Sequence, residues 1–288
     1  MKSLLFATMM LHAGGGRYLG QDYNAAWRGP NGRYELGARV KSFRYLDAFD
    51  GTVVEYSARV ARHLPHVSIG ARVGTAPPNA QRAAYHLAAG EATLTFYGLT
   101  LGPSHPETLA TVAEDTTTLA ELSHLDSDWV TRGRARFTST NHHQSPPSAL
   151  AKGFDLVQNS WQFDASLTWK RRTRLALDGG GDRYSRTVLG SDPTWYLWNV
   201  DYAGAPIAVR GWPKNHVGAR FEQELGAFSA RAGFTRITML SGDLEVLAGG
   251  EGAWRPGEPL ELRIGWHQRH QRHHETRAVW SAGASYRW

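Results

Sequence analysis

Apolar and polar residues alternate along most of this chain, in short segments separated by turn-forming residues. Side chains of a strand alternate faces with period two, so each segment has one apolar and one polar face. The pattern is typical of an all-β chain and predicts about 12–14 strands. The segments are 34–40, 54–60, 67–73, 92–98, 129–137, 161–169, 175–177, 196–202, 207–209, 217–221, 228–234, 244–248, 260–266 and 278–288.

One internal segment indicates that the apolar faces of the strands contact lipid. Trp161, Phe163, Ala165, Leu167 and Trp169 share one face, with aromatic rings at both ends and smaller apolar residues between them. A strand that faces lipid is expected to look this way, because aromatic rings gather at the two membrane interfaces. Residues 102–128 show no such pattern, and a helix around 110–125, a long loop or a further hairpin all fit them.

The last strand carries a family resemblance. Its apolar face holds small residues and ends in aromatics, and these residues are Ala278, Trp280, Ala282, Ala284, Tyr286 and Trp288. This resembles the closing strand of bacterial outer-membrane β-barrels, in which Trp280, Tyr286 and Trp288 would be the signal read by the barrel-assembly machinery. The resemblance implies one antiparallel transmembrane β-barrel over residues 14–288 in a bacterial outer membrane. A soluble β-sandwich is the competing fold.

Composition narrows the function classes. The 288 residues include no cysteine, which argues against a disulfide scaffold, and the formal net charge is +6. A basic chain raises nucleic acid as a partner, but Arg132, Arg134 and Arg136 alternate with other residues instead of clustering. We therefore expect arginines that line a lumen or meet anionic lipopolysaccharide and other outer-membrane lipids, and no nucleic-acid partner. Mixed charge in a narrow lumen favours a paired polar interior over a wide pore.

The N-terminus allows two interpretations. Lys2 precedes an apolar run from Leu4 to Leu11, and Ala13 follows, which together resemble a short secretory signal over residues 1–13. Leu11 fits the small-residue rule before the cleavage site poorly. The alternatives are a truncated or mis-assigned start and a first strand.

A second, local resemblance suggests catalysis. His143 and Ser145 form a His-x-Ser motif on the predicted outer face, and Asn159 falls on the same face of the next strand. Outer-membrane phospholipase A and the lipid A deacylases carry such a motif. The resemblance implies Ser145 as nucleophile, His143 as general base and Asn159 as the residue that orients it, with calcium as cofactor and a homodimer as the assembly. Pro146 departs from the family, because proline has no N–H to offer an oxyanion.

Counting strands backwards from a periplasmic C-terminus, with 207–212 taken as a strand, places the His-, Ser- and Pro-rich loop 141–153 at the extracellular end. Residues 267–274 are predicted to form a basic hairpin tip that contacts lipopolysaccharide phosphates, with metal binding as the alternative. Asp178–Asp182 is predicted to be a flexible turn.

Three function classes remain, in this order: a non-enzymatic envelope role, structural or binding; a lipid esterase; and a narrow channel. No cofactor is certain.

Overall fold

The computed structural model describes residues 4–14, 18–29, 33–45, 52–64, 66–78, 84–101, 129–144, 154–170, 172–188, 212–257, 259–271 and 276–287. The predicted features at 102–128, 196–202 and 207–209 lie outside these residues, as do Ser145, Trp288, His273 and His274. Within the described residues, no helix is long and apolar enough to cross a membrane.

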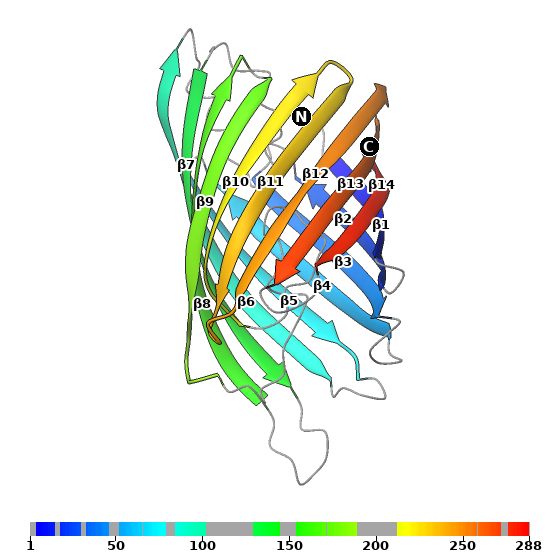
Figure 1. Ribbon diagram of the computed structural model, residues 1–288. Helices are drawn as coiled ribbons and strands as arrows, with labels where there is room; N and C mark the ends of the chain where they lie inside the picture. Colours follow the sequence, from blue (N-terminus) through cyan, green and yellow to red (C-terminus); the bar gives the residue numbers. More distant parts are fainter. Residues whose placement is uncertain are drawn as a thin grey trace.

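In the described part of the chain, fourteen antiparallel strands form one closed barrel. Each strand pairs with its neighbours in sequence, and β1 pairs with β14 (Figure 1). The predicted all-β barrel of 12–14 strands is confirmed. The strands of the first half are β1 Leu4–Gly14, β2 Tyr18–Arg28, β3 Tyr34–Tyr45, β4 Thr52–His63, β5 Val67–Ala76, β6 Tyr85–Leu101 and β7 Trp129–Gln144. Those of the second half are β8 Phe154–Trp169, β9 Thr173–Tyr184, β10 Pro213–Leu225, β11 Phe228–Met239, β12 Leu244–Gly257, β13 Leu260–Gln271 and β14 Arg277–Arg287.

The two faces of the barrel wall differ as the alternation predicts. Large apolar side chains point outward and remain exposed, such as Ile69 at 57 %, Phe163 at 52 % and Ile264 at 62 %. Charged side chains at the intervening positions, such as Glu35, Asp164 and Arg174, are buried inside. Because a soluble sandwich would bury its apolar faces, this inverted arrangement is that of a membrane barrel.

Strand lengths are uneven around the barrel. β6, β7 and β8 contain 17, 16 and 16 residues, while β5 contains 10 and β14 contains 11. Seven strands separate the connection after β7 from the end of β14, so this connection lies at the barrel end opposite to the C-terminus. β7 continues to Gln144, so 141–144 belong to the strand instead of the loop. That this end of the barrel is the extracellular one stays a prediction.

The N-terminal residues are part of the barrel wall. Leu4–Gly14 form β1, which pairs with β14 on one side and with β2 on the other. Cleavage after Ala13 would leave only Gly14 of this strand. The signal peptide of residues 1–13 stays a prediction, and the structure has the first-strand alternative instead.

The predicted turn at Asp178–Asp182 is wrong, because these residues lie inside β9. The glycines there are required by crowding from neighbouring strands. A Cβ atom on Gly180 would lie 2.2 Å from the Trp161 carbonyl oxygen, and one on Gly181 would lie 2.6 Å from the Trp161 ring. Similarly, His267 and His270 belong to β13 and not to a hairpin tip, and His267 is buried inside the barrel.

Candidate functional site

The first feature of the lumen is a series of ion pairs between residues of nearby strands. Arg59 of β4 lies between Glu35 of β3 at 2.9 Å and Glu91 of β6 at 2.5 Å. In another part of the barrel, Arg269 of β13 lies 2.5 Å from Glu245 of the adjacent strand β12, and the Glu245 side chain is fully buried. Such pairs satisfy charges that would be costly if buried alone. They agree with the paired polar interior predicted from the sequence.

The second feature is a row of arginines on β7. Arg132, Arg134 and Arg136 all point inward, and Arg134 lies directly opposite Asp164 of β8. The Asp164 carboxylate accepts a hydrogen bond from Arg134 at 2.5 Å and lies 3.9 Å from Arg132. The inward residue of β8 opposite Arg136 is Gln162, and on β6 the residue opposite is Thr93. Among the β6 and β8 residues that pair directly with these three arginines, Asp164 is the one carboxylate.

A third feature is a buried hydrogen-bond relay nearer the connection after β7. The Tyr85 hydroxyl contacts His142 Nδ1, and His142 Nε2 lies 2.9 Å from Gln158 Oε1. Because the Gln158 oxygen can only accept, Nε2 carries the proton, and Nδ1 accepts from the tyrosine. Gln158 Nε2 then donates to Asp182 at 2.7 Å, and Ser160 donates to the same carboxylate oxygen at 2.5 Å. The relay links β6, β7, β8 and β9 across the inner wall.

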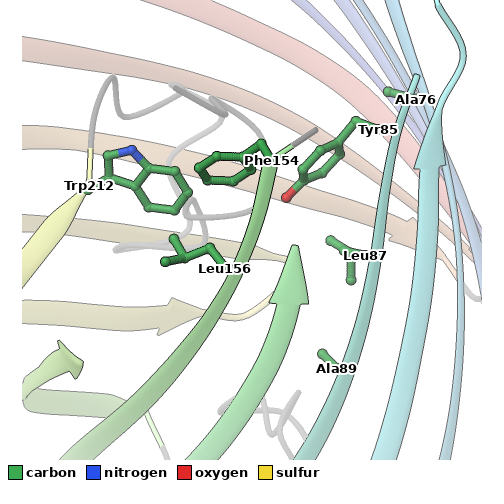
Figure 2. Close-up of a cluster of buried hydrophobic side chains, with 7 residues drawn as sticks. All are labelled: Ala76, Tyr85, Leu87, Ala89, Phe154, Leu156 and Trp212. Atoms are coloured by element: carbon green, nitrogen blue, oxygen red, sulfur yellow. The ribbon is translucent and has the colours of Figure 1, made fainter. Parts of the chain in front are cut away.

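An apolar cluster lies beside this relay inside the same end of the barrel. Figure 2 shows the rings of Trp212, Phe154 and Tyr85 following one another, with Leu156 and Leu87 next to them. Trp212 is central, because its ring lies 5.6 Å from that of His142, 5.9 Å from that of Phe154 and 5.5 Å from that of Tyr184. All five labelled large residues are at most 7 % exposed. This end of the lumen is thus packed with side chains along the β6–β10 wall.

The residues predicted to catalyse lipid hydrolysis are only partly brought together. His143 points outward as predicted and is about half exposed, and its Nδ1 lies 2.6 Å from Asp155 Oδ1. Asn159 also points outward but pairs with Ser139, four residues along the strand from Asp155. The register therefore corrects the predicted orienting residue: Asp155, and not Asn159, contacts His143. Ser145 lies outside the described residues, and its role stays a prediction.

The other predicted features are the aromatic residues of the last strand and a metal site. Trp280 is 59 % exposed, its ring lies 6.5 Å from that of Trp266, and Tyr286 is 40 % exposed on the same face of β14. Their part in barrel assembly stays a prediction. In the part of the chain that the structure describes, no three His, Asp or Glu side chains are placed to hold a metal ion. Calcium as the cofactor of an esterase stays a prediction.

The sequence analysis missed the relay and Asp155. The period-two pattern does place Tyr85, His142 and Gln158 on inward faces, and this was the available signal. Their pairing depends on how far each strand is shifted against its neighbour, because one residue of shift reverses every face.

Known proteins resemble the chain in fold but not in sequence. OccAB1 of Acinetobacter baumannii is 10 % identical over 99 % of this chain and 95 % of that one, with a TM-score of 0.50. The outer-membrane protein OprD of Pseudomonas aeruginosa is 9 % identical over 99 % and 94 %, with a TM-score of 0.47. OpdK of the same organism, solved with vanillate, is 10 % identical over 99 % and 98 %, with a TM-score of 0.46.

No family model matches the sequence, and no curated protein does. The resemblance to outer-membrane phospholipase A gains no support from these structures. At such low identity the likeness concerns the fold alone. The chain has the fold of a bacterial outer-membrane β-barrel.

Proposed function

We propose that this protein is an outer-membrane channel that passes small polar solutes and prefers anions. The observation that carries the proposal is the inward row Arg132, Arg134 and Arg136, which outnumbers the carboxylates beside it. Guanidinium groups hydrogen-bond carboxylates and phosphates readily, and a low-dielectric wall concentrates their field in the lumen. The ion pairs elsewhere on the inner wall keep the lumen polar without giving it a strong overall sign.

The test is ion selectivity in planar lipid bilayers. We expect the folded barrel to conduct, with a reversal potential in a potassium chloride gradient that indicates preference for chloride. Replacing all three residues together, R132Q, R134Q and R136Q, should shift the reversal potential towards potassium. Arg236→Gln is the matched control, because Arg236 points away from the lumen and is exposed on β11. Its reversal potential should stay at the wild-type value.

Two results would overturn the proposal. Folded wild-type barrel without conductance would select the non-enzymatic envelope role. Conductance with no shift in the triple variant would mean that the β7 arginines do not set selectivity. Heat-modifiable gel migration checks folding of each variant, and Arg136→Gln alone is the milder variant should the triple change not fold.

A surface lipid esterase is the second candidate function, favoured by the His143–Asp155 contact on the outer face. A carboxylate that hydrogen-bonds Nδ1 fixes the histidine tautomer and leaves Nε2 to accept a proton from a serine. If Ser145 is the nucleophile, hydrolysis of phospholipid or lipid A should vanish in Ser145→Ala and His143→Ala. It should fall strongly in Asp155→Asn and stay nearly unchanged in Asn159→Ala. Absence of hydrolysis by the wild type, with and without calcium, would exclude this function.

A further inference from the structure

An open groove of about 690 Å³ crosses the outer face of β5–β9. This volume falls within the roughly 300–1,000 Å³ typical of small-molecule sites. Most of its lining residues occupy outward positions of these strands, and the lining is mainly apolar. The outward lining residues are Ile69, Gly90, Ala92, Phe137, Ser139, Asn159, Trp161 and Arg183. The lining residue Glu91 belongs to the inner wall, where its carboxylate pairs with Arg59.

The groove lies at the boundary of the apolar belt. On β8 the outward aromatics Trp161 and Trp169 are separated by eight residues, or about 26 Å along the strand. At the usual tilt of about 35–45° this is roughly 20 Å across the membrane, close to the ~25 Å apolar band of such barrels. Trp161 therefore marks the interface at the end opposite to the C-terminus. Asn159 and the residues before it lie beyond the belt.

Two rows of paired residues give the groove an apolar half and a polar half. On the belt side, Ile69, Ala92, Phe137 and Trp161 follow one another across β5 to β8. One outward row further along the strands, Gly90, Ser139, Asn159 and Arg183 follow one another across β6 to β9. An amphipathic groove at an interface matches the junction between the acyl chains and the headgroup of a lipid.

Small residues form the floor of the groove. A Cβ atom built on Gly90 meets nothing within 4 Å, so the space above this residue is open. Ile69 at 57 % exposure and Phe137 at 46 % stand on either side as walls. The floor is therefore shaped by the absence of a side chain, and a larger residue at position 90 would fill it.

Arg183 supplies the charge. Its guanidinium lies over the Trp161 ring, 5.8 Å from the ring centroid, at the polar end of the groove. Stacking on the ring holds the planar group in place while its N–H donors stay available to an anion. The neighbouring Asn159 adds an amide on the same row. Phosphate is the anion that lipids present at this depth.

We propose that this groove binds one phosphate-bearing lipid of the outer leaflet. Arg183 and Asn159 hold the phosphate, and an acyl chain lies against Ala92, Phe137 and Trp161. The site is separate from the lumen, so it is independent of whether the barrel conducts.

The experiment is native mass spectrometry of the purified barrel titrated with diphosphorylated lipid A in neutral detergent. We expect one bound lipid at low concentration. Arg183→Gln should weaken binding by about tenfold to hundredfold, the range expected for lost charge-assisted hydrogen bonds. Gly90→Leu should abolish the first binding event by filling the floor. Lipid A without phosphates should bind as weakly to the wild type as the phosphorylated form binds to Arg183→Gln.

Two matched controls separate the groove from general effects. Gly133 also faces outward on β7 with open space around it but does not line the groove, so Gly133→Leu should bind like the wild type. Arg236→Gln removes an outward arginine elsewhere and should also bind normally. Wild-type affinity in both Arg183→Gln and Gly90→Leu would overturn the proposal, as would equal binding of the phosphate-free lipid. A third arm with inorganic phosphate alone should show no binding, because the acyl chain contributes most of the contact.

Discussion

The wall made by β6–β8 differs from the wall made by β11–β14 in length and in what its extra length holds. About 9–11 residues suffice for a strand to cross the apolar belt. β11, β12, β13 and β14 contain 12, 14, 12 and 11 residues, at most about three more than this range. β6–β8 exceed it by several residues, all at the end beyond Trp161.

The two walls also bury different things. The inner face of the shorter wall holds ion pairs such as Arg231–Glu251 at 2.8 Å and Arg269–Glu245 at 2.5 Å. The extra length of β6–β8 holds Tyr85, His142 and Gln158 of the relay on its inside. Its outside carries the polar half of the groove and the His143–Asp155 contact. The residues of β6–β8 that exceed the length needed to cross the membrane thus carry the relay, the polar half of the groove and the His143–Asp155 contact.

The largest effect expected from this contrast is on stability. Trp212→Ala empties a site that is 5 % exposed and surrounded by the rings of His142, Phe154 and Tyr184. We expect the free energy of unfolding to fall by about 3–5 kcal/mol, as for other buried aromatic truncations. Equilibrium unfolding in guanidinium chloride, with the barrel in phospholipid vesicles, measures it.

The matched change on the other wall is Trp254→Ala. Trp254 is 43 % exposed on the outer face and stacks on Phe228 with ring centroids 6.2 Å apart. Loss of that stacking should cost about 0.5–1.5 kcal/mol. If the two variants lost equal stability, the cluster on the long wall would be no more important than the lipid-facing surface, and the contrast would fail.

Much of this architecture could be predicted from alternation alone. Trp161, Phe163 and Leu167 identified a lipid-facing stripe because period two is a local property that tertiary contacts do not alter. The inward direction of Arg132, Arg134 and Arg136 followed from the same rule. The faces of the strands are therefore readable from the sequence of a barrel. The individual strands are less so, because β2 matches none of the predicted segments.

The errors concern what depends on neighbouring strands. Gly180 and Gly181 resemble part of a turn locally, but the crowding by Trp161 that requires glycine appears only once β8 and β9 are paired. In the same way, Asn159 and Asp155 both face outward, and only the register of β7 against β8 decides which of them meets His143. Residue identity and spacing do not contain that register.

A smaller difference in stability is expected between variants of two consecutive histidines, which lie on opposite faces of β7. His142 is 1 % exposed and joins Tyr85 to Gln158. The side chain of His143 is 47 % exposed and contacts the exposed Asp155. His142→Ala leaves the Gln158 oxygen without its donor and opens a void, which should cost about 2–4 kcal/mol. His143→Ala removes a solvent-screened contact and should cost about 0–1 kcal/mol.

Both variants replace histidine with alanine in the same strand, so the change in strand propensity cancels when their free energies of unfolding are compared. Unfolding the two variants in the same vesicles therefore isolates the effect of facing inward. Equal losses would mean that the relay contributes nothing beyond an ordinary surface contact, and the extra length of β6–β8 would then need an explanation on its outer face alone.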